Sequence, residues 1–239
     1  MNQIISMHGW GSDSNIWRNW MSSFSSNKWI WQNGERGYGN LSPFLPSWES
    51  TYDNNKYLKK VVICHSLGIH LVKESILKSS THIILINSFS GFIPRNKQSR
   101  QIAIALKGMK EAIGKGDKEE KMLLNFLTKS SSPNSIDSLF NGPIPYNLST
   151  QGRQRLLNDL ELLINTSKLP RGFPGKSNIL VVNSEEDLIV TKPIQSQLLM
   201  DLNKNTINPI CYWRLPNEGH SSLGVNLMLR VKDWLTYSL

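Results

Sequence analysis

The amino-acid sequence predicts an α/β protein in which a doubly wound, mostly parallel sheet carries an inserted helical cap. Short apolar runs without polar alternation, which are typical of strands covered on both faces, alternate with segments of helical periodicity. A block without a convincing strand, residues 89–171, interrupts this alternation. A length of 239 residues is sufficient for one such domain and is too short for two full domains.

The first 88 residues contain the patterns of four strands and two helices. Ser12, Asp13 and Ser14 are favourable N-cap residues, and apolar side chains follow them at helical spacing, so a helix is expected there. A second helix is expected over residues 67–79, where apolar positions recur at helical intervals. The expected strands are residues 3–7, 29–32, 61–64 and 83–86.

The rest of the chain contains the expected cap and the end of the sheet. Three amphipathic segments within residues 89–171 are expected to cover the carboxyl edge of the sheet, where open α/β folds bind ligands. Residues 1–88 and 172–239 form the expected core. The expected elements are cap helices 98–113, 118–129 and 153–165, then strand 179–182, a helix after Pro193, strand 211–214 and helix 223–237.

Composition and charge disfavour several classes of protein. Cys64 and Cys211 are the only cysteines and no Cys/His ligand spacing occurs, so we expect no disulfide framework, no metal site and a reducing cytoplasm. No apolar run approaches the ~20 residues that span a bilayer, and no leader pattern precedes the first strand, so we expect neither membrane insertion nor secretion. The net charge of +9 comes without a basic block or a nucleic-acid-binding fingerprint, which disfavours nucleic acid as a partner.

A candidate nucleophile lies between a predicted strand and a predicted helix, in the tetrapeptide His65-Ser66-Leu67-Gly68. A sharp strand-to-helix turn can hold a serine hydroxyl out toward substrate when the residues around it are small. Cys64 occupies the first position of the usual G-x-S-x-G pattern, where glycine is expected. The alternative interpretation is that Ser66 is an ordinary helix N-cap.

The base and the acid that such a serine needs come from two later loops. Among the five histidines, His220 follows the last predicted strand and therefore lies at the same sheet edge as Ser66. Asp187 follows the strand before it and would orient the imidazole, although Glu185 and Glu186 remain alternatives. The chain order of nucleophile, acid and base is that of an α/β-hydrolase.

Two backbone N–H groups complete the predicted site. Negative charge develops on the carbonyl oxygen of the substrate during attack, and preorganised N–H donors stabilise it. Leu67 follows the nucleophile directly, and Trp10 lies in the loop after the first strand, where the second donor is expected. The alternative for Trp10 is a plain glycine turn with a packed side chain.

The sequence resembles the α/β-hydrolase superfamily over nearly its whole length, and more narrowly the pimeloyl-[acyl-carrier protein] methyl ester esterases of biotin synthesis. In the cap, Phe126 lies in a segment similar to one that lines the acyl channel of that family. We expect an α/β-hydrolase fold that is shortened at its N-terminus, without the hairpin common in that family. The sequence also departs from the family in Cys64 and in a reduced loop at residues 35–39. The segments that carry the resemblance are His8-Gly9-Trp10-Gly11, Asn15-Ile16-Trp17-Arg18, Ser66-Leu67-Gly68, Asn125-Phe126-Leu127, Asp187-Leu188-Ile189-Val190 and Gly219-His220.

The resemblance implies an esterase that needs no cofactor. Ser66 would attack the ester carbonyl, His220 would accept its proton, Asp187 would hold the imidazole, and methanol would leave. Trp10, Leu67 and Phe126 would contact the substrate. Alternatives are a short-chain esterase or C–C hydrolase without a carrier partner, and a non-catalytic binding protein of the same fold.

The charge of the cap agrees with an acidic acyl-carrier protein as partner. Between Phe92 and Arg171 there are thirteen basic and seven acidic residues, which gives this segment a net charge of +6. Complementary charge steers the encounter of two proteins. The alternative is that amphipathic helices expose lysine for solubility.

Overall fold

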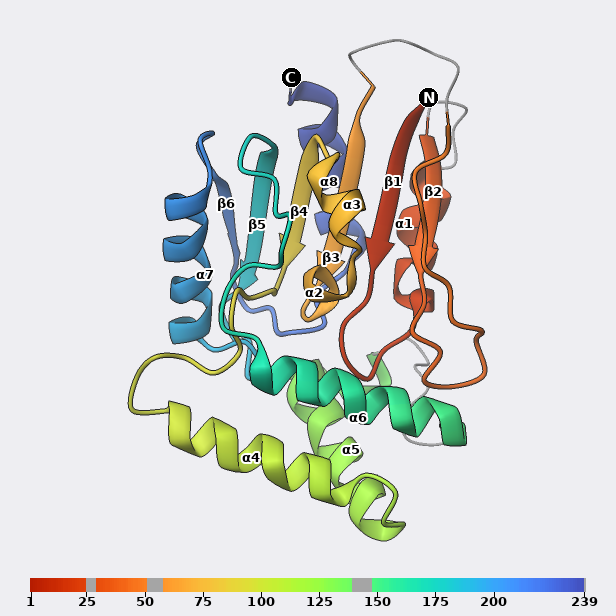
Figure 1. The fold of residues 1–239 in the computed structure, drawn as a ribbon, viewed down its shortest axis with the longest axis vertical. Coiled ribbons are helices and arrows are strands. Elements are labelled where there is room, and N and C mark those ends of the chain that lie inside the picture. Colours follow the sequence, from red (N-terminus) through yellow and green to blue (C-terminus); the bar gives the residue numbers. More distant parts are fainter. Residues whose placement is uncertain (25–28, 51–57, 139–147, 239) are drawn as a thin grey trace.

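A computed structural model of the protein describes residues 1–24, 29–50, 58–138 and 148–238. Its centre is one six-stranded sheet in the order β2-β1-β3-β4-β5-β6, and every neighbouring pair is parallel (Figure 1). The predicted fold class is therefore confirmed. The strands are β1 Asn2–Met7, β2 Trp29–Gly34, β3 Lys60–His65, β4 His82–Ile86, β5 Asn178–Ser184 and β6 Cys211–Leu215.

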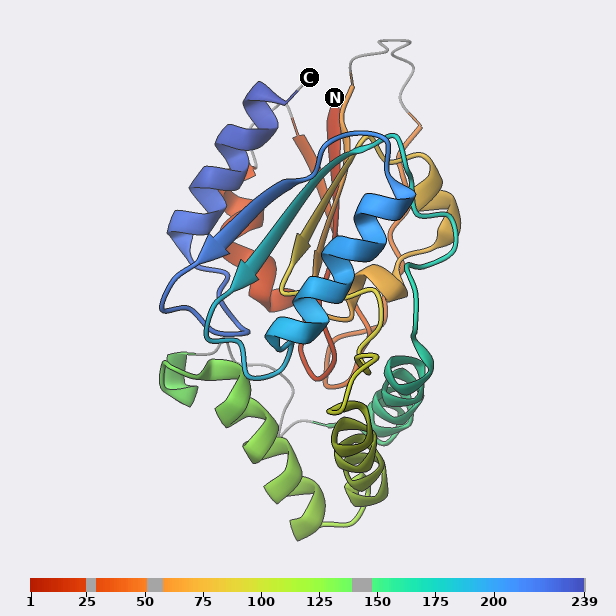
Figure 2. The ribbon, with the colours of Figure 1, turned by 90° about the vertical axis from the view of Figure 1, so that its left-hand side faces the viewer.

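Helices cover both faces of the sheet, as Figure 2 shows. On one face α1 (Arg18–Phe24) and α8 (Val225–Tyr237) pack against residues such as Ile63 and Val182. On the other face lie α2 (Gly68–Leu71), α3 (Glu74–Lys78) and α7 (Lys192–Asn205). Because the central strands β3 and β4 are buried on both faces, their sequences are apolar without alternation.

The helix expected over residues 67–79 is interrupted, which corrects that prediction. Val72 and Lys73 have extended backbone with ψ of 137° and 142°, so α2 ends and α3 begins there. The interruption turns the chain while Ile69, Val72 and Ile76 stay in the same buried cluster against the sheet. Periodicity alone did not reveal it, because apolar spacing continues across the break.

The helix expected after the first strand begins as a short 3-10 segment. Ser14–Trp17 forms this segment, and α1 continues directly from it. The N-cap is Asp13, whose carboxylate accepts a hydrogen bond from the backbone N–H of Asn15 at 2.9 Å.

Three further helices lie between β4 and β5 in the chain and beyond the carboxyl ends of the strands in space (Figure 1). They are α4 (Ser99–Ala112), α5 (Asp117–Ser131) and α6 (Thr150–Asn165), and a short 3-10 turn, Ile136–Ser138, follows α5. An isolated bridge between Gly91 and Ser167 joins the two ends of this insertion. The boundaries 89 and 171 stay a prediction, and residues 139–147 lie outside the described part.

A third apolar cluster joins these helices to the core. It contains Trp10, Leu67 and Phe89 from the sheet edge together with Leu123 and Leu156 from the insertion. The insertion therefore rests on the loops at the carboxyl edge of the sheet. In the part of the chain that the structure describes, no helix has the length and apolar character to cross a bilayer.

Candidate active site

Ser66 lies on a sharp turn between β3 and α2. Its φ of 54° is in the left-handed region that side chains rarely adopt, and its N–H donates to Ile86 O at 3.0 Å. The hydroxyl of Ser88 donates to Ser66 O at 2.6 Å, which fixes the turn from the other side. The N-cap of α2 is Leu67, so Ser66 does not have the alternative role of a helix cap.

Two glycines allow this turn to sit against the first loop. A Cβ on Gly68 would lie 2.5 Å from Met7 O, and a Cβ on Gly9 would lie 2.8 Å from the Cβ of Ser66. The glycine-rich loop after β1 therefore approaches the Ser66 hydroxyl more closely than any side chain would permit. Cys64, which replaces the first glycine of the usual pattern, is fully buried, and burial raises its thiol pKa.

Ser66, His220 and Asp187 form one hydrogen-bonded line. His220 Nε2 lies 3.1 Å from Ser66 Oγ, and His220 Nδ1 lies 2.8 Å from Asp187 Oδ2. All three residues are buried. Since Nδ1 faces a carboxylate, the neutral ring carries its hydrogen there, and Nε2 is left to accept a proton from the serine.

The structure distinguishes Asp187 from the two neighbouring glutamates. Asp187 Oδ1 accepts the backbone N–H groups of Ile189 and Val190 at 2.7 and 2.8 Å, which leaves Oδ2 for His220. Glu185 instead pairs with Arg214 at 3.0 Å, and Glu186 is exposed. Asp187 is thus the carboxylate that contacts the imidazole.

The other four histidines bond elsewhere. His8 Nδ1 lies 2.8 Å from Gly9 O, and His70 Nε2 lies 2.9 Å from Phe89 O. His82 contacts Thr81, and His65 reaches the carbonyl oxygen of His220 rather than its ring. Of the five histidines, His220 is the one whose ring meets the Ser66 hydroxyl.

The two predicted backbone donors flank the Ser66 turn. Trp10 and Leu67 are both buried, and within the described residues neither backbone N–H forms a hydrogen bond. Leu67 is the N-cap of α2, and the N–H groups at the start of a helix have no partner within that helix. The role of Trp10 and Leu67 as oxyanion donors stays a prediction.

The side chain of Trp10 joins the first loop to the cap. Its indole N–H donates to Leu156 O at 2.9 Å, and Phe126 packs edge-on against its ring with centroids 4.9 Å apart. Phe126, the predicted acyl-channel residue, therefore lies next to the first loop. Trp10 and Leu67 belong to the third apolar cluster, and Phe126 is partly buried and packs against it.

Asp159 on α6 is a buried residue that sequence reasoning missed. Arg36 binds its two carboxylate oxygens at 2.7 and 2.5 Å, and the Tyr38 hydroxyl donates to it at 2.6 Å. Arg155 donates to Gly37 O at 2.8 Å. The reduced loop at residues 35–39 therefore anchors the cap, and no spacing in the sequence connects Arg36 with a residue 123 positions later.

Glu35 anchors the same loop to the core. Its carboxylate accepts the backbone N–H groups of Ser14 and Gly37 at 2.8 and 2.7 Å, and it lies 3.5 Å from His8 Nε2. Burial alone raises the pKa of Glu35, but contact with His8 and these two N–H groups outweighs burial and holds the pKa at about 2.

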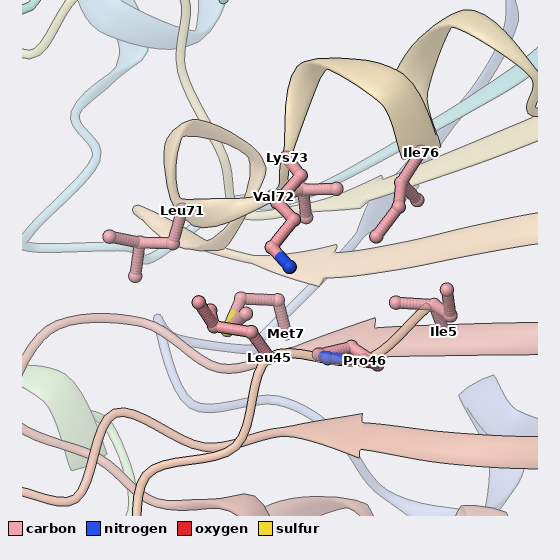
Figure 3. A pocket seen from close by; sticks show the side chains of 8 residues that line it. All are labelled: Ile5, Met7, Leu45, Pro46, Leu71, Val72, Lys73 and Ile76. Carbon is pink, nitrogen blue, oxygen red and sulfur yellow. The ribbon is translucent and has the colours of Figure 1, made fainter. Parts of the chain in front are cut away.

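An apolar hollow lies on the α2–α3 face of the sheet, apart from these residues (Figure 3). None of the residues that line it belongs to the hydrogen-bonded line of Ser66, His220 and Asp187. Among the described residues, no group of three His, Cys, Asp or Glu side chains is arranged to hold a metal ion. The lining residues of the hollow are Ile5, Met7, Leu45, Pro46, Leu71, Val72, Lys73 and Ile76.

Comparison with known proteins connects the fold with hydrolases. No protein-family model and no curated protein matches the sequence. An esterase (EaEST) from Exiguobacterium antarcticum superposes with a TM-score of 0.66 at 12% identity, over 99% of this chain and 91% of that one. MGS-M2, an alpha/beta hydrolase from a Medee basin deep-sea metagenome library, superposes with a TM-score of 0.66 at 15% identity, over 100% of this chain and 90% of that one. MenH from S. aureus superposes with a TM-score of 0.57 at 14% identity, over 98% of this chain and 93% of that one. Likeness at these identities is a likeness of fold, and the chain has the α/β-hydrolase fold.

Proposed function

We propose that the protein is a serine carboxylesterase. The observation that carries this proposal is the hydrogen-bonded line of Ser66, His220 and Asp187, with the serine held at a φ of 54° on a strand-to-helix turn. Backbone strain of this kind persists where the surrounding structure enforces it, and it is concentrated at functional sites. The proposal agrees with the esterases among the proteins of similar fold.

The geometry supports a two-step hydrolysis. Ser66 Oγ attacks the ester carbonyl as His220 Nε2 takes its proton, and Asp187 stabilises the imidazolium that forms. The N–H groups of Trp10 and Leu67 stabilise the oxyanion. His220 then protonates the departing alcohol, and water activated by His220 releases the acid from Ser66.

Hydrolysis of p-nitrophenyl acetate by purified protein tests this activity. Ser66→Ala should reduce turnover to the background rate, whereas Ser75→Ala, on the exposed side of α3, should keep the unmutated rate. Loss of at least about a thousandfold is expected, because the nucleophile and its base act as one unit. Hydrolysis by Ser66→Ala at the unmutated rate would exclude the proposal.

The finer proposal is that the substrate is the methyl ester of pimeloyl-[acyl-carrier protein], cleaved in biotin synthesis. The apolar side chains of Trp10, Phe126 and Leu67 agree with an uncharged acyl chain. An acidic carrier would approach the cap, where seven exposed bases have no side-chain partner within the described residues. They are Lys97, Arg100, Lys115, Lys118, Lys121, Lys129 and Lys168.

The two bases of the cap nearest in sequence to Asp159 are engaged internally. Arg153 Nε contacts both carboxylate oxygens of the buried Glu119 at 2.9 and 3.0 Å, and Arg155 donates to Gly37 O. Their loss would therefore change the cap itself. We assign the docking surface to α5 and choose Lys118 and Lys121 to test it.

A side-by-side assay tests the carrier proposal. The double variant Lys118→Glu/Lys121→Glu should lower kcat/KM for methyl-pimeloyl-carrier protein about tenfold and leave p-nitrophenyl acetate unaffected. Lys176→Glu/Lys204→Glu changes the net charge equally on the core surface and should affect neither substrate. Cleavage of the small ester alone would favour a short-chain esterase without a carrier and contradict the finer proposal.

A further inference from the structure

We propose that His65 and Asn87 are positioning residues that hold His220 through its carbonyl oxygen. This inference rests on the proposed esterase function, in which the His220 ring must meet the Ser66 hydroxyl. It concerns the main chain of His220, whereas Asp187 holds its side chain.

Two side chains donate to the same carbonyl oxygen. His65 Nε2 and Asn87 Nδ2 each lie 2.8 Å from His220 O, so both lone pairs of this oxygen are used. Asn87 Nδ2 also lies 3.2 Å from Gly219 O. The residue before His220 and His220 itself are therefore tied to the ends of β3 and β4.

The hydrogen bond fixes the tautomer of His65. Because Nε2 faces a carbonyl oxygen, it must carry the hydrogen, and Nδ1 is then a buried acceptor without a partner among the described residues. Burial, together with the His220 ring 4.8 Å away, lowers the pKa of His65 to about 3. The ring is therefore neutral when the imidazolium forms on His220.

Asn87 is itself rigidly held. It follows β4 with a φ of 46°, accepts the Ser184 N–H on Oδ1 at 2.8 Å and donates from Nδ2 to Ser184 Oγ at 3.0 Å. Its side chain thus joins the ends of β4 and β5 to the loop of His220. The two side chains that bind His220 O therefore come from the ends of strands, which are more rigid than loops.

The functional consequence follows from distance. His220 Nε2 and Ser66 Oγ are 3.1 Å apart, which is within the range for proton transfer. A displacement of 1 Å can reduce the rate about a hundredfold. Holding the carbonyl oxygen limits the positions that the ring can take.

Two substitutions of His65 separate the hydrogen bond from the ring. The amide nitrogen of His65→Gln reaches as far as Nε2 and keeps the donor, whereas His65→Asn is too short to reach His220 O. The readouts are kcat and KM for p-nitrophenyl acetate and the rate of fluorophosphonate labelling of Ser66. We expect His65→Asn to lower kcat and the labelling rate about 10- to 100-fold at an unchanged KM, and His65→Gln to stay within about threefold of the unmutated protein.

Asn87→Asp is an isosteric second variant that replaces the donor with an acceptor facing the carbonyl oxygen. If His65→Asn does not fold, Asn87→Asp takes its place in the test, and it should slow the labelling of Ser66 by a similar factor. The inference would be overturned if His65→Asn or Asn87→Asp labelled at the same rate as the unmutated protein. It would also be overturned if His65→Gln and His65→Asn lost the same fraction of kcat. Failure of the unmutated protein to label at all would instead contradict the esterase proposal.

Discussion

Gly219, next to His220, lies directly against the carbonyl oxygen of Ser132 at the end of α5. A Cβ built on Gly219 would lie 1.7 Å from that oxygen, so no larger residue fits while the two segments stay in place. The N–H of Ser221 donates to Ser130 O at 3.1 Å and closes the contact on the other side. The end of a cap helix thus rests on the loop that holds the imidazole.

We expect Gly219→Ala to displace this loop. The backbone clash should cost about 1–3 kcal/mol in the free energy of unfolding and lower kcat for p-nitrophenyl acetate. Gly108→Ala on α4 is the control, because its new Cβ meets no atom within 4 Å and should stabilise the helix by up to ~1 kcal/mol. Denaturant unfolding and kcat measure both effects, and an unchanged kcat in folded Gly219→Ala would contradict the coupling.

We expect Asp159→Asn to loosen the cap. This change keeps the shape of the side chain but removes the charge that Arg36 and Tyr38 bind. Breaking one partner of a buried pair costs about 3 kcal/mol. Glu161→Gln on the same helix removes an exposed pair with Lys110 and should cost less than about 1 kcal/mol. Equal midpoints of chemical unfolding for the two variants would argue against the anchor.

Acid should destabilise the fold through buried histidines. Burial lowers the pKa of His65 to about 3 and those of His70 and His82 to about 4, whereas the unfolded chain takes up these protons near pH 6.5. Between pH 6.5 and 4 the unfolded state binds more protons, so stability is full above pH 6.5 and is lost as the pH falls. Each histidine contributes a slope of about 1.4 kcal/mol per pH unit.

The His82→Gln variant tests this slope away from Ser66. Urea titrations from pH 7 to 4.5 measure the free energy of unfolding of both proteins. Its slope against pH should be smaller in His82→Gln than in the unmutated protein, by about 1.4 kcal/mol per pH unit. Parallel curves would show that His82 is not held neutral. Glu35, with its pKa lowered to about 2, adds a loss of stability in the same direction below pH 4.5.

Phe126→Ala should change the acyl preference. Phe126 packs against the Trp10 ring beside the Ser66 turn, so its truncation removes apolar surface that a longer acyl chain would contact and an acetyl group would not reach. We expect kcat/KM for p-nitrophenyl hexanoate, relative to acetate, to fall about tenfold. Phe44→Ala removes a half-exposed ring from the loop at residues 35–50 and should leave the ratio unchanged. If Phe126→Ala kept the unmutated ratio of hexanoate to acetate kcat/KM, Phe126 would not contact the acyl chain.

Local patterns sufficed for the sheet and for the residues at its edge. Buried strands such as β3 and β4 are continuous apolar runs, and the ends of parallel strands meet at one edge, so Ser66 and His220 could be brought together from the sequence. Asp187 could not be separated from Glu185 by spacing. That distinction comes from the N–H groups of Ile189 and Val190, which hold one carboxylate oxygen.

Contacts between segments far apart in the chain could not be predicted from the sequence. Arg36 and Asp159 read as ordinary charged residues, and their pairing depends on how α6 crosses the edge of the sheet. The double donation of His65 and Asn87 to His220 O likewise depends on backbone positions at three strand ends. Neither follows from periodicity or from a motif, because side-chain geometry decides both.

The central claim is that Ser66 is an activated nucleophile. Incubation with a fluorophosphonate, followed by intact-mass and peptide mass spectrometry, tests it directly, because the reagent phosphonylates serines that a neighbouring base has activated. We predict one label per chain on Ser66, and none in the His220→Ala variant. No label, or a label on a different serine, would contradict the account.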